Sequence, residues 1–108
     1  MALRPTQKMK KRYILFSLKG NLGKEELEKG IYKHSLRFFG EHGLSTHIAR
    51  LIEFDEKRKE GILLANREGA NSILGMLALI NEIEGRPARL IAKRTSGTLL
   101  SLREKEKG

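Results

Sequence analysis

The spacing of apolar residues along this chain changes in an order that few small folds can accommodate. Alternating or continuous apolar runs predict strands at residues 12–18, 46–54, 61–65 and 88–95. Between these runs, apolar residues that recur every three or four positions predict one helix from residue 24 to Gly40 or Gly43 and a second from 70 to about 85. The predicted order is therefore strand, helix, strand, strand, helix, strand.

This order favours an α+β fold, a ferredoxin-like or RNA-recognition-motif-like β-α-β-β-α-β sandwich with an antiparallel sheet in the order 4-1-3-2. A chain of 108 residues is long enough for one such domain. We predict a flexible basic arm at residues 1–11, one domain at 12–102 and a charged tail at 103–108. The alternation in residues 46–54 does not decide which of the two sets of side chains faces the core.

The net charge of +9 is concentrated in two windows of the sequence. Residues 1–12 contain five basic residues and no acid, and residues 86–103 again contain five basic residues and no acid. The 73 residues between them hold ten bases and eleven acids, so they are nearly neutral. A positive field with this shape indicates a polyanionic partner such as RNA.

The predicted topology brings the two basic windows together. In the 4-1-3-2 order, the first strand begins beside the end of the fourth, so residues 10–12 are expected to lie near Lys93, Arg94 and Arg103. Ser96 and Thr98 flank a glycine and either close a turn with local hydrogen bonds or donate to a phosphate. The residues expected to contact RNA are Lys8, Lys10, Lys11, Arg12, Arg86, Arg89, Lys93, Arg94, Ser96, Thr98 and Arg103.

Sequence-specific stacking of bases on the sheet is not expected. RNA-recognition motifs stack bases on aromatic residues of their third and first strands. The third predicted strand, residues 61–65, has no aromatic residue, and Tyr13 and Phe16 of the first strand point to opposite faces. Phosphate contacts by lysine and arginine, which position RNA without reading its sequence, remain as the predicted mode of binding.

The sequence offers no catalytic or metal-binding constellation. There is no cysteine, which excludes disulfides and thiolate ligands and fits a cytoplasmic setting. The spacing of His34, His42 and His47 matches no usual metal-ligand pattern. The acidic residues between 53 and 60 are expected to form a solvated loop, and no apolar run is long enough to span a membrane.

The second predicted helix carries few charges. Its residues Met76 and Leu79, with Ile83, present more apolar surface than one face of a sheet is expected to cover. This pattern indicates either a contact with another protein or ordinary core packing.

Four short motifs, taken together, resemble a known family. They are Lys10–Phe16 at the first strand, Phe39–Gly43 at the end of the first helix, Leu51–Glu56 followed by Gly61 and Ile62, and Arg94–Thr98 at the last strand. In order and spacing they resemble the archaeal ribonuclease P protein component 2 family, which is shared with small eukaryotic ribonuclease P and MRP subunits. The likeness extends from about Lys10 to Leu102.

The resemblance implies a subunit of the ribonucleoprotein that removes the 5′ leader from precursor tRNA. It implies that the RNA performs the cleavage with bound metal ions, for which Mg²⁺ is expected, and that this chain has no catalytic residue and no cofactor of its own. The implied partners are the ribonuclease P RNA, precursor tRNA indirectly, and the TIM-barrel-like protein component 3 in a two-plus-two assembly. Of the matched residues, Lys10, Lys11, Arg12, Arg94, Ser96 and Thr98 would carry the RNA contacts.

Three other functions are compatible with the predicted fold. The chain could be an RNA-binding domain of a different ribonucleoprotein. An acylphosphatase-like enzyme needs a glycine-rich loop with an arginine directly after the first strand, and residues 19–23 contain no arginine. A domain that senses small molecules would give no reason for a net charge of +9.

Overall fold

The computed structural model of the protein describes residues 11–44 and 49–99, and for residues 41–44 it describes the backbone only. The predicted arm before residue 11, the first residues of the predicted second strand and the predicted tail lie outside these ranges. The elements are β1 (Lys11–Lys19), α1 (Lys24–Leu44), β2 (Ala49–Asp55), β3 (Glu60–Asn66), α2 (Ala70–Leu79), β4 (Glu82–Ile83), β5 (Arg86–Pro87) and β6 (Arg89–Ser96).

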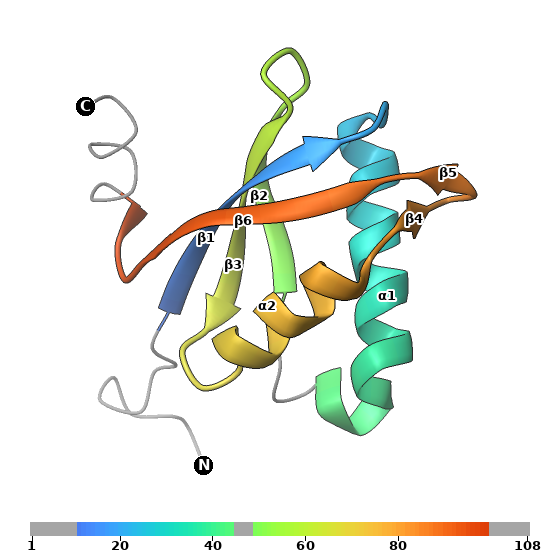
Figure 1. Ribbon diagram of the computed structural model, residues 1–108. Helices are drawn as coiled ribbons and strands as arrows, with labels where there is room; N and C mark the ends of the chain where they lie inside the picture. Colours follow the sequence, from blue (N-terminus) through green and yellow to red (C-terminus); the bar gives the residue numbers. More distant parts are fainter. Residues whose placement is uncertain (1–10, 45–48, 100–108) are drawn as a thin grey trace.

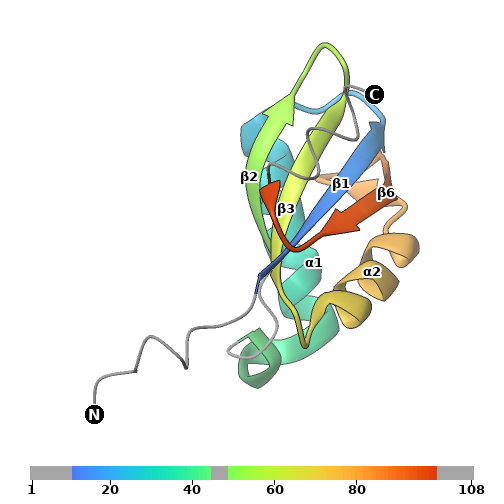
Figure 2. The same ribbon diagram turned by 90° about the vertical axis from the view of Figure 1, so that its left-hand side faces the viewer.

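Four of the strands form one antiparallel sheet in the order β2-β3-β1-β6, and both helices cover the same face of it (Figures 1 and 2). With β6 as the fourth long strand, this is the predicted order 4-1-3-2, so the expected ferredoxin-like fold is confirmed. Figure 2 shows the sheet from the opposite side, which neither α1 nor α2 covers. We call this second side the open face.

The core lies between the sheet and the two helices. Ile14, Phe16 and Leu18 alternate along β1 toward the helices and are at most 3% exposed. Burial of such side chains contributes about 1.5–3 kcal/mol each. Gly61 on the neighbouring strand β3 makes room for Phe16, because a Cβ there would lie 2.7 Å from the Phe16 ring. The alternation predicted for the first strand is therefore the pattern that builds the core.

A bulge in β2 explains why its sequence did not show which side chains face the core. Leu51 pairs with Leu63 of β3, but Glu53 is the next residue to find a partner, so Ile52 is an extra residue in the strand. The bulge changes the phase of the alternation. As a result Leu51 and Phe54 both face the helices, and the Phe54 ring stacks on Phe16 with a centroid distance of 6.4 Å.

Helix α1 begins at the predicted glycine. The Gly23 N–H donates to Glu26 Oε1 at 3.2 Å, and the Gly23 carbonyl accepts the first helical hydrogen bond from Leu27. Gly40, one of the two glycines predicted to end the helix, marks a break, because it has a φ of 75° and leaves the helical region. The chain then resumes a helical course up to Leu44.

Helix α2 is shorter than predicted. It ends at Leu79, Ile80 is extended with a ψ of 123°, and β4 and β5 then form a small hairpin where the sequence predicted helix up to residue 85. The two residues of its turn, Glu84 and Gly85, have φ values of 51° and 77°, which is typical of a type I′ turn. The prediction was wrong because Ile83 fits helical spacing but packs elsewhere.

The hairpin carries Ile83 into the core beside α1. Ile83 is 1% exposed, and it lies so close to Gly30 of α1 that a Cβ on this glycine would collide with Ile83 Cγ2. Gly30 therefore permits the close approach of hairpin and helix. This tertiary contact competes with the last turn of the predicted helix and replaces it.

Candidate nucleic-acid interface

The start of β1 lies beside the end of β6, as the sequence predicted. Ile14 pairs with Thr95 and Leu15 with Arg94, so Lys11 and Arg12 extend along the residues that follow Arg94. The Arg12 guanidinium lies against Gly97, with Nη1 3.1 Å from the position of a Cβ on that glycine. Two basic segments more than 80 positions apart in the sequence thus meet at one end of the sheet. Lys8, Lys10 and Arg103 lie outside the described residues.

Two hydroxyl groups lie at this same end. Ser96 is directly opposite Tyr13 in the sheet, and its Oγ accepts a hydrogen bond of 3.2 Å from the Thr98 N–H. This is the local bond expected of a turn. It uses the Ser96 oxygen as an acceptor, which leaves the hydroxyl hydrogen able to donate to a phosphate. We call Lys11, Arg12, Arg94, Ser96 and Thr98 the basic end.

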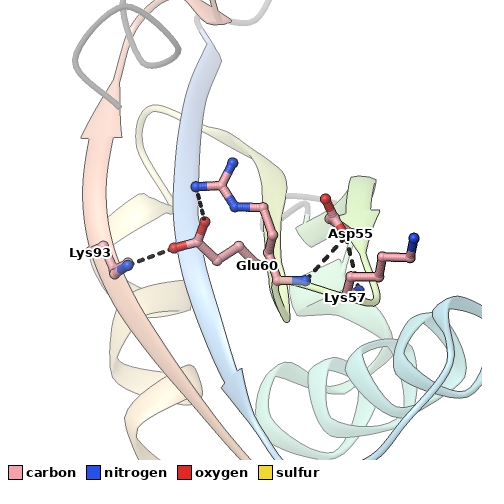
Figure 3. A network of polar contacts seen from close by, with 5 residues as sticks. Asp55, Lys57, Glu60 and Lys93 are labelled. Atoms are coloured by element: carbon pink, nitrogen blue, oxygen red, sulfur yellow. Dashed lines mark hydrogen bonds and ion pairs between the residues drawn. The ribbon is translucent and has the colours of Figure 1, made fainter. Parts of the chain in front are cut away.

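Lys93 is held by an acid. It is the extra residue at a bulge in β6, since Arg94 pairs with Leu15 and Ala92 pairs with Phe16. Its Nζ lies 2.6 Å from Glu60 Oε2 of β3, across β1, and Arg58 Nη2 lies 3.4 Å from the other oxygen of the same carboxylate (Figure 3). The Glu60 side chain is 15% exposed. Lys93, which was predicted to contact RNA, is therefore compensated within the chain.

The turn that follows β2 is ordered by an aspartate. Asp55 Oδ1 accepts hydrogen bonds from the backbone N–H groups of Lys57 at 2.9 Å and Arg58 at 3.2 Å (Figure 3). This is the usual way in which aspartate stabilises a turn. Two of the acids that the sequence analysis placed in a solvated loop, Asp55 and Glu60, thus have structural partners.

Arg86 and Arg89 lie at the opposite end of the sheet. Arg89 is opposite Lys19, the last residue of β1, which places it about 25 Å from Lys11 at a rise of about 3.3 Å per residue. Arg86 Nη1 lies 3.2 Å from Glu26 Oε2 and donates to the Asn21 carbonyl at 3.2 Å. We call this region the far end. The two basic windows therefore form one cluster only at the basic end.

The loop before α1 does not resemble a phosphate site. Carboxylates occupy the helix N-terminus. Glu26 accepts a hydrogen bond from the Gly23 N–H, and Glu56 Oε2 accepts one of 3.4 Å from the backbone N–H of Lys24. An anion at this position would face two negative charges. The geometry therefore disfavours the acylphosphatase-like alternative.

The described histidine has a structural contact. His34 Nε2 lies 2.6 Å from the Glu82 carbonyl oxygen, which ties α1 to the β4–β5 hairpin. The side chains of His42 and His47 are outside the described part of the chain. Within that part, no three His, Cys, Asp or Glu residues lie close enough to hold a metal ion, and none of its helices is both long and apolar enough to cross a membrane.

Apolar surface is exposed beside the edge strand β6. Met76 and Ile83, which were considered for a protein contact, are each 1% exposed and belong to the core. Leu79 is 69% exposed and Ile91 of β6 is 45% exposed. Ile91 lines a shallow groove of about 320 Å³ between α2 and β6, and seven of the eight described residues that line this groove are apolar.

Two residues of the open face were missed by the sequence analysis. Arg50 of β2 pairs with Leu64, which pairs in turn with Tyr13, so the three form one row across the sheet. The bulge in β2 hid the orientation of Arg50. The sequence predicted no stacking on Tyr13 because Phe16, the other aromatic residue of the strand, points to the opposite face. The alternation with Ile14 and Phe16 nevertheless places Tyr13 on the open face.

Comparison with known proteins agrees with this geometry. A model of the Rpp14/Pop5 family matches residues 12–106. The chain belongs to this family. Proteins named ribonuclease P protein component 2 from Pyrococcus furiosus and Thermococcus gammatolerans are 33% and 35% identical to it over 105 residues, which are 95% of this chain and 88% of each relative.

A solved structure shares the fold of this Rpp14/Pop5 chain. A chain in the cryo-EM structure of yeast ribonuclease MRP superimposes with a TM-score of 0.68 over 94% of both chains, at 11% sequence identity. The resemblance noted in the sequence is therefore confirmed at the level of the family, and the predicted sandwich at the level of the fold.

Proposed function

We propose that the protein is a subunit of ribonuclease P, the ribonucleoprotein that removes the 5′ leader from precursor tRNA, and that it binds and stabilises the catalytic RNA. Membership of the Rpp14/Pop5 family, with relatives named ribonuclease P protein component 2, is the observation that supports this most strongly. The basic end supports it independently, because it is a compact group of cations and hydroxyl groups suited to an RNA backbone.

In this proposal the RNA and its metal ions break the phosphodiester bond. The contribution of the protein is electrostatic: side chains at the basic end replace counterions on the RNA and reduce the repulsion between phosphates that the folded RNA brings together. The endoribonuclease activity then belongs to the whole assembly, which acts in the cytoplasm.

We propose further that the protein partner is component 3, in a two-plus-two assembly. The exposed apolar side chains of Leu79 and Ile91 support a protein contact of this kind, and Ile91 lines an apolar groove, since exposed apolar surface is typical of interfaces. The groove lies at the edge strand β6, whereas the acidic residues of the β2–β3 turn lie toward the opposite edge of the sheet.

Reconstitution tests this function. The ribonuclease P RNA and the other protein components of the same organism would be assembled with and without this chain, and cleavage of the leader would be followed on precursor tRNA. We expect the chain alone to cleave nothing and its addition to raise turnover at moderate Mg²⁺. Cleavage that does not depend on the chain would contradict the proposal.

A second candidate is an RNA-binding subunit of a different ribonucleoprotein, which the basic end would serve equally well. Sequencing of the RNA that co-purifies with the chain from its source cells distinguishes the two. Enrichment of an RNA other than that of ribonuclease P would favour this second candidate.

A further inference from the structure

A single aromatic side chain lies on the open face of the sheet. Tyr13 alternates with Ile14 and Phe16, which face the helices, and therefore points to the other side. Phe16 and Phe54, the two other aromatic residues on the described strands, stack on each other on the helical side of the sheet. The remaining aromatic residues of the chain, Tyr32, Phe38 and Phe39, belong to α1.

Apolar neighbours hold Tyr13 in place. Leu15 and Ile62, each 4% exposed, form a small cluster on the open face, and Tyr13, Ile52 and Leu99 pack against it. Tyr13 remains half-buried, so part of it is accessible. A ring supported in this way loses little conformational entropy when a ligand stacks on it.

Cations and a hydroxyl group surround Tyr13. Ser96 is directly opposite on β6, about 5 Å away, and Arg94 lies diagonally at about 7 Å on the same face. Arg50 is in the same row, two strands away on the other side, at about 10 Å. In the described part of the chain, no acidic side chain forms an ion pair with Arg50 or Arg94.

We propose that Tyr13 is a stacking platform for one unpaired base of RNA, whose flanking phosphates lie toward Arg94 and Arg50. The inference rests on the proposed RNA-binding function and deepens it. The surrounding positive charge favours a nucleic acid over an apolar peptide, and a π face accepts any base. With one ring in place of the two that RNA-recognition motifs use, stacking adds affinity without reading a sequence.

The composition of the chain allows a direct measurement. It has no tryptophan and two tyrosines, and Tyr32 is 59% exposed on α1, on the helical side of the sheet. The full chain with Tyr32→Phe therefore has Tyr13 as its only strong intrinsic fluorophore. We expect a single-stranded RNA decamer at low salt to quench this fluorescence by more than half, after correction for absorption by the RNA.

An abasic strand of the same length serves as the control ligand, because it supplies phosphates without bases. We expect it to bind, as measured by the anisotropy of a dye at its end, and to leave the fluorescence of Tyr13 unchanged. RNA that binds by anisotropy but does not quench would overturn the platform while leaving the proposed function intact.

Variants at Tyr13 separate stacking from packing. Tyr13→Phe keeps the ring and should bind the decamer as the parent does. Tyr13→Leu keeps an apolar side chain but removes the π face, and it should lose about tenfold in affinity at an unchanged salt slope. A Tyr13→Leu protein that is folded and binds RNA with parental affinity would refute the platform.

Two further outcomes distinguish a failure of the stacking platform from a failure of the proposed RNA-binding function. Quenching of Tyr13 by component 3 but not by RNA would make the open face a protein interface and overturn the platform. A chain that binds neither the RNA nor the abasic strand at low ionic strength would overturn the proposed function as well.

Discussion

The two ends of β1 both carry basic side chains, but the surroundings of these side chains differ. At the basic end, Lys11, Arg12 and Arg94 form no ion pair with any acid of the described chain. Midway along β6, Lys93 is held by Glu60, and at the far end Arg86 is held by Glu26. A count of basic residues in the sequence therefore overestimates the charge that is available to a partner.

This difference is one of binding rather than of stability. Partly exposed ion pairs of this kind contribute about 0–1 kcal/mol to folding. Each of them nevertheless places an acid beside a cation, which weakens the attraction of that cation for a phosphate at any distance beyond the pair. The comparison thus predicts that RNA contacts are concentrated at the basic end.

The strongest test of the comparison replaces three cations at each end. Lys11→Ala, Arg12→Ala and Arg94→Ala together should weaken binding of the RNA about a hundredfold at moderate salt, and should reduce the magnitude of the salt slope by about two to three units. The matched far-end variant is Lys19→Ala, Arg86→Ala and Arg89→Ala, since Lys19 lies opposite Arg89. Affinity would be measured by titration at several salt concentrations.

Both triple variants lower the net charge of +9 by three, so an effect of overall charge would be equal in the two. We expect the far-end variant to lose less than about tenfold in affinity, with a salt slope within one unit of the parent. The far-end variant also releases Glu26 from its ion pair with Arg86, which biases it toward weaker binding and makes the control stringent. Equal losses in the two variants would abolish the distinction between the ends.

A glycine tests whether the far end is structural. Gly30→Ala places a Cβ against Ile83, and we expect a net loss of about 1–2 kcal/mol in the free energy of unfolding, because the clash outweighs the gain in helix propensity. The midpoint of urea unfolding measures this loss. The salt slope of RNA binding should not change, because the hairpin lies away from the basic end.

Gly75 provides the control for this substitution. It also lies within a helix, but a Cβ there would meet nothing within 4 Å. Gly75→Ala should therefore stabilise the protein by up to about 1 kcal/mol through helix propensity alone. If the two alanine variants had the same stability, close packing of the hairpin on α1 would not be the reason for Gly30.

The basic end was predictable from the sequence because it depends on topology alone. Six elements in this order favour one sandwich, and antiparallel neighbours place the start of β1 beside the end of β6 whatever the detailed register. The separation of Arg86 and Arg89 from this cluster follows from the same antiparallel pairing. This separation was also predictable, because Arg86 and Arg89 lie at the start of the last predicted strand, which an antiparallel pairing places beside the end of β1.

The pairing of charges was not predictable. Lys93 and Glu60 are 33 positions apart and Arg86 and Glu26 are 60 apart, so no local pattern joins them. Lys93 reaches Glu60 from a bulge in β6, and a second bulge determines which way Arg50 points. Bulges depend on packing between strands, as the short α2 depends on Ile83, and neither leaves a clear periodic signal.

The smallest expected effect concerns Glu60, which makes the surroundings of Lys93 unlike those of the basic end. Glu60→Gln keeps the shape of the side chain and removes its charge, so Lys93 would become available to phosphates. We expect RNA affinity to rise a few-fold at low salt, the salt slope to steepen by about one unit, and stability to change by less than about 1 kcal/mol. Glu56→Gln is the matched control, since Glu56 lies in the turn directly before β3 and its replacement raises the net charge equally, but no described contact joins it to Lys93. A larger gain in RNA affinity for Glu60→Gln than for Glu56→Gln would show that the release of a paired cation, rather than overall charge, extends the RNA-binding surface along β6. Equal gains in affinity would show that Glu60 does not restrain Lys93.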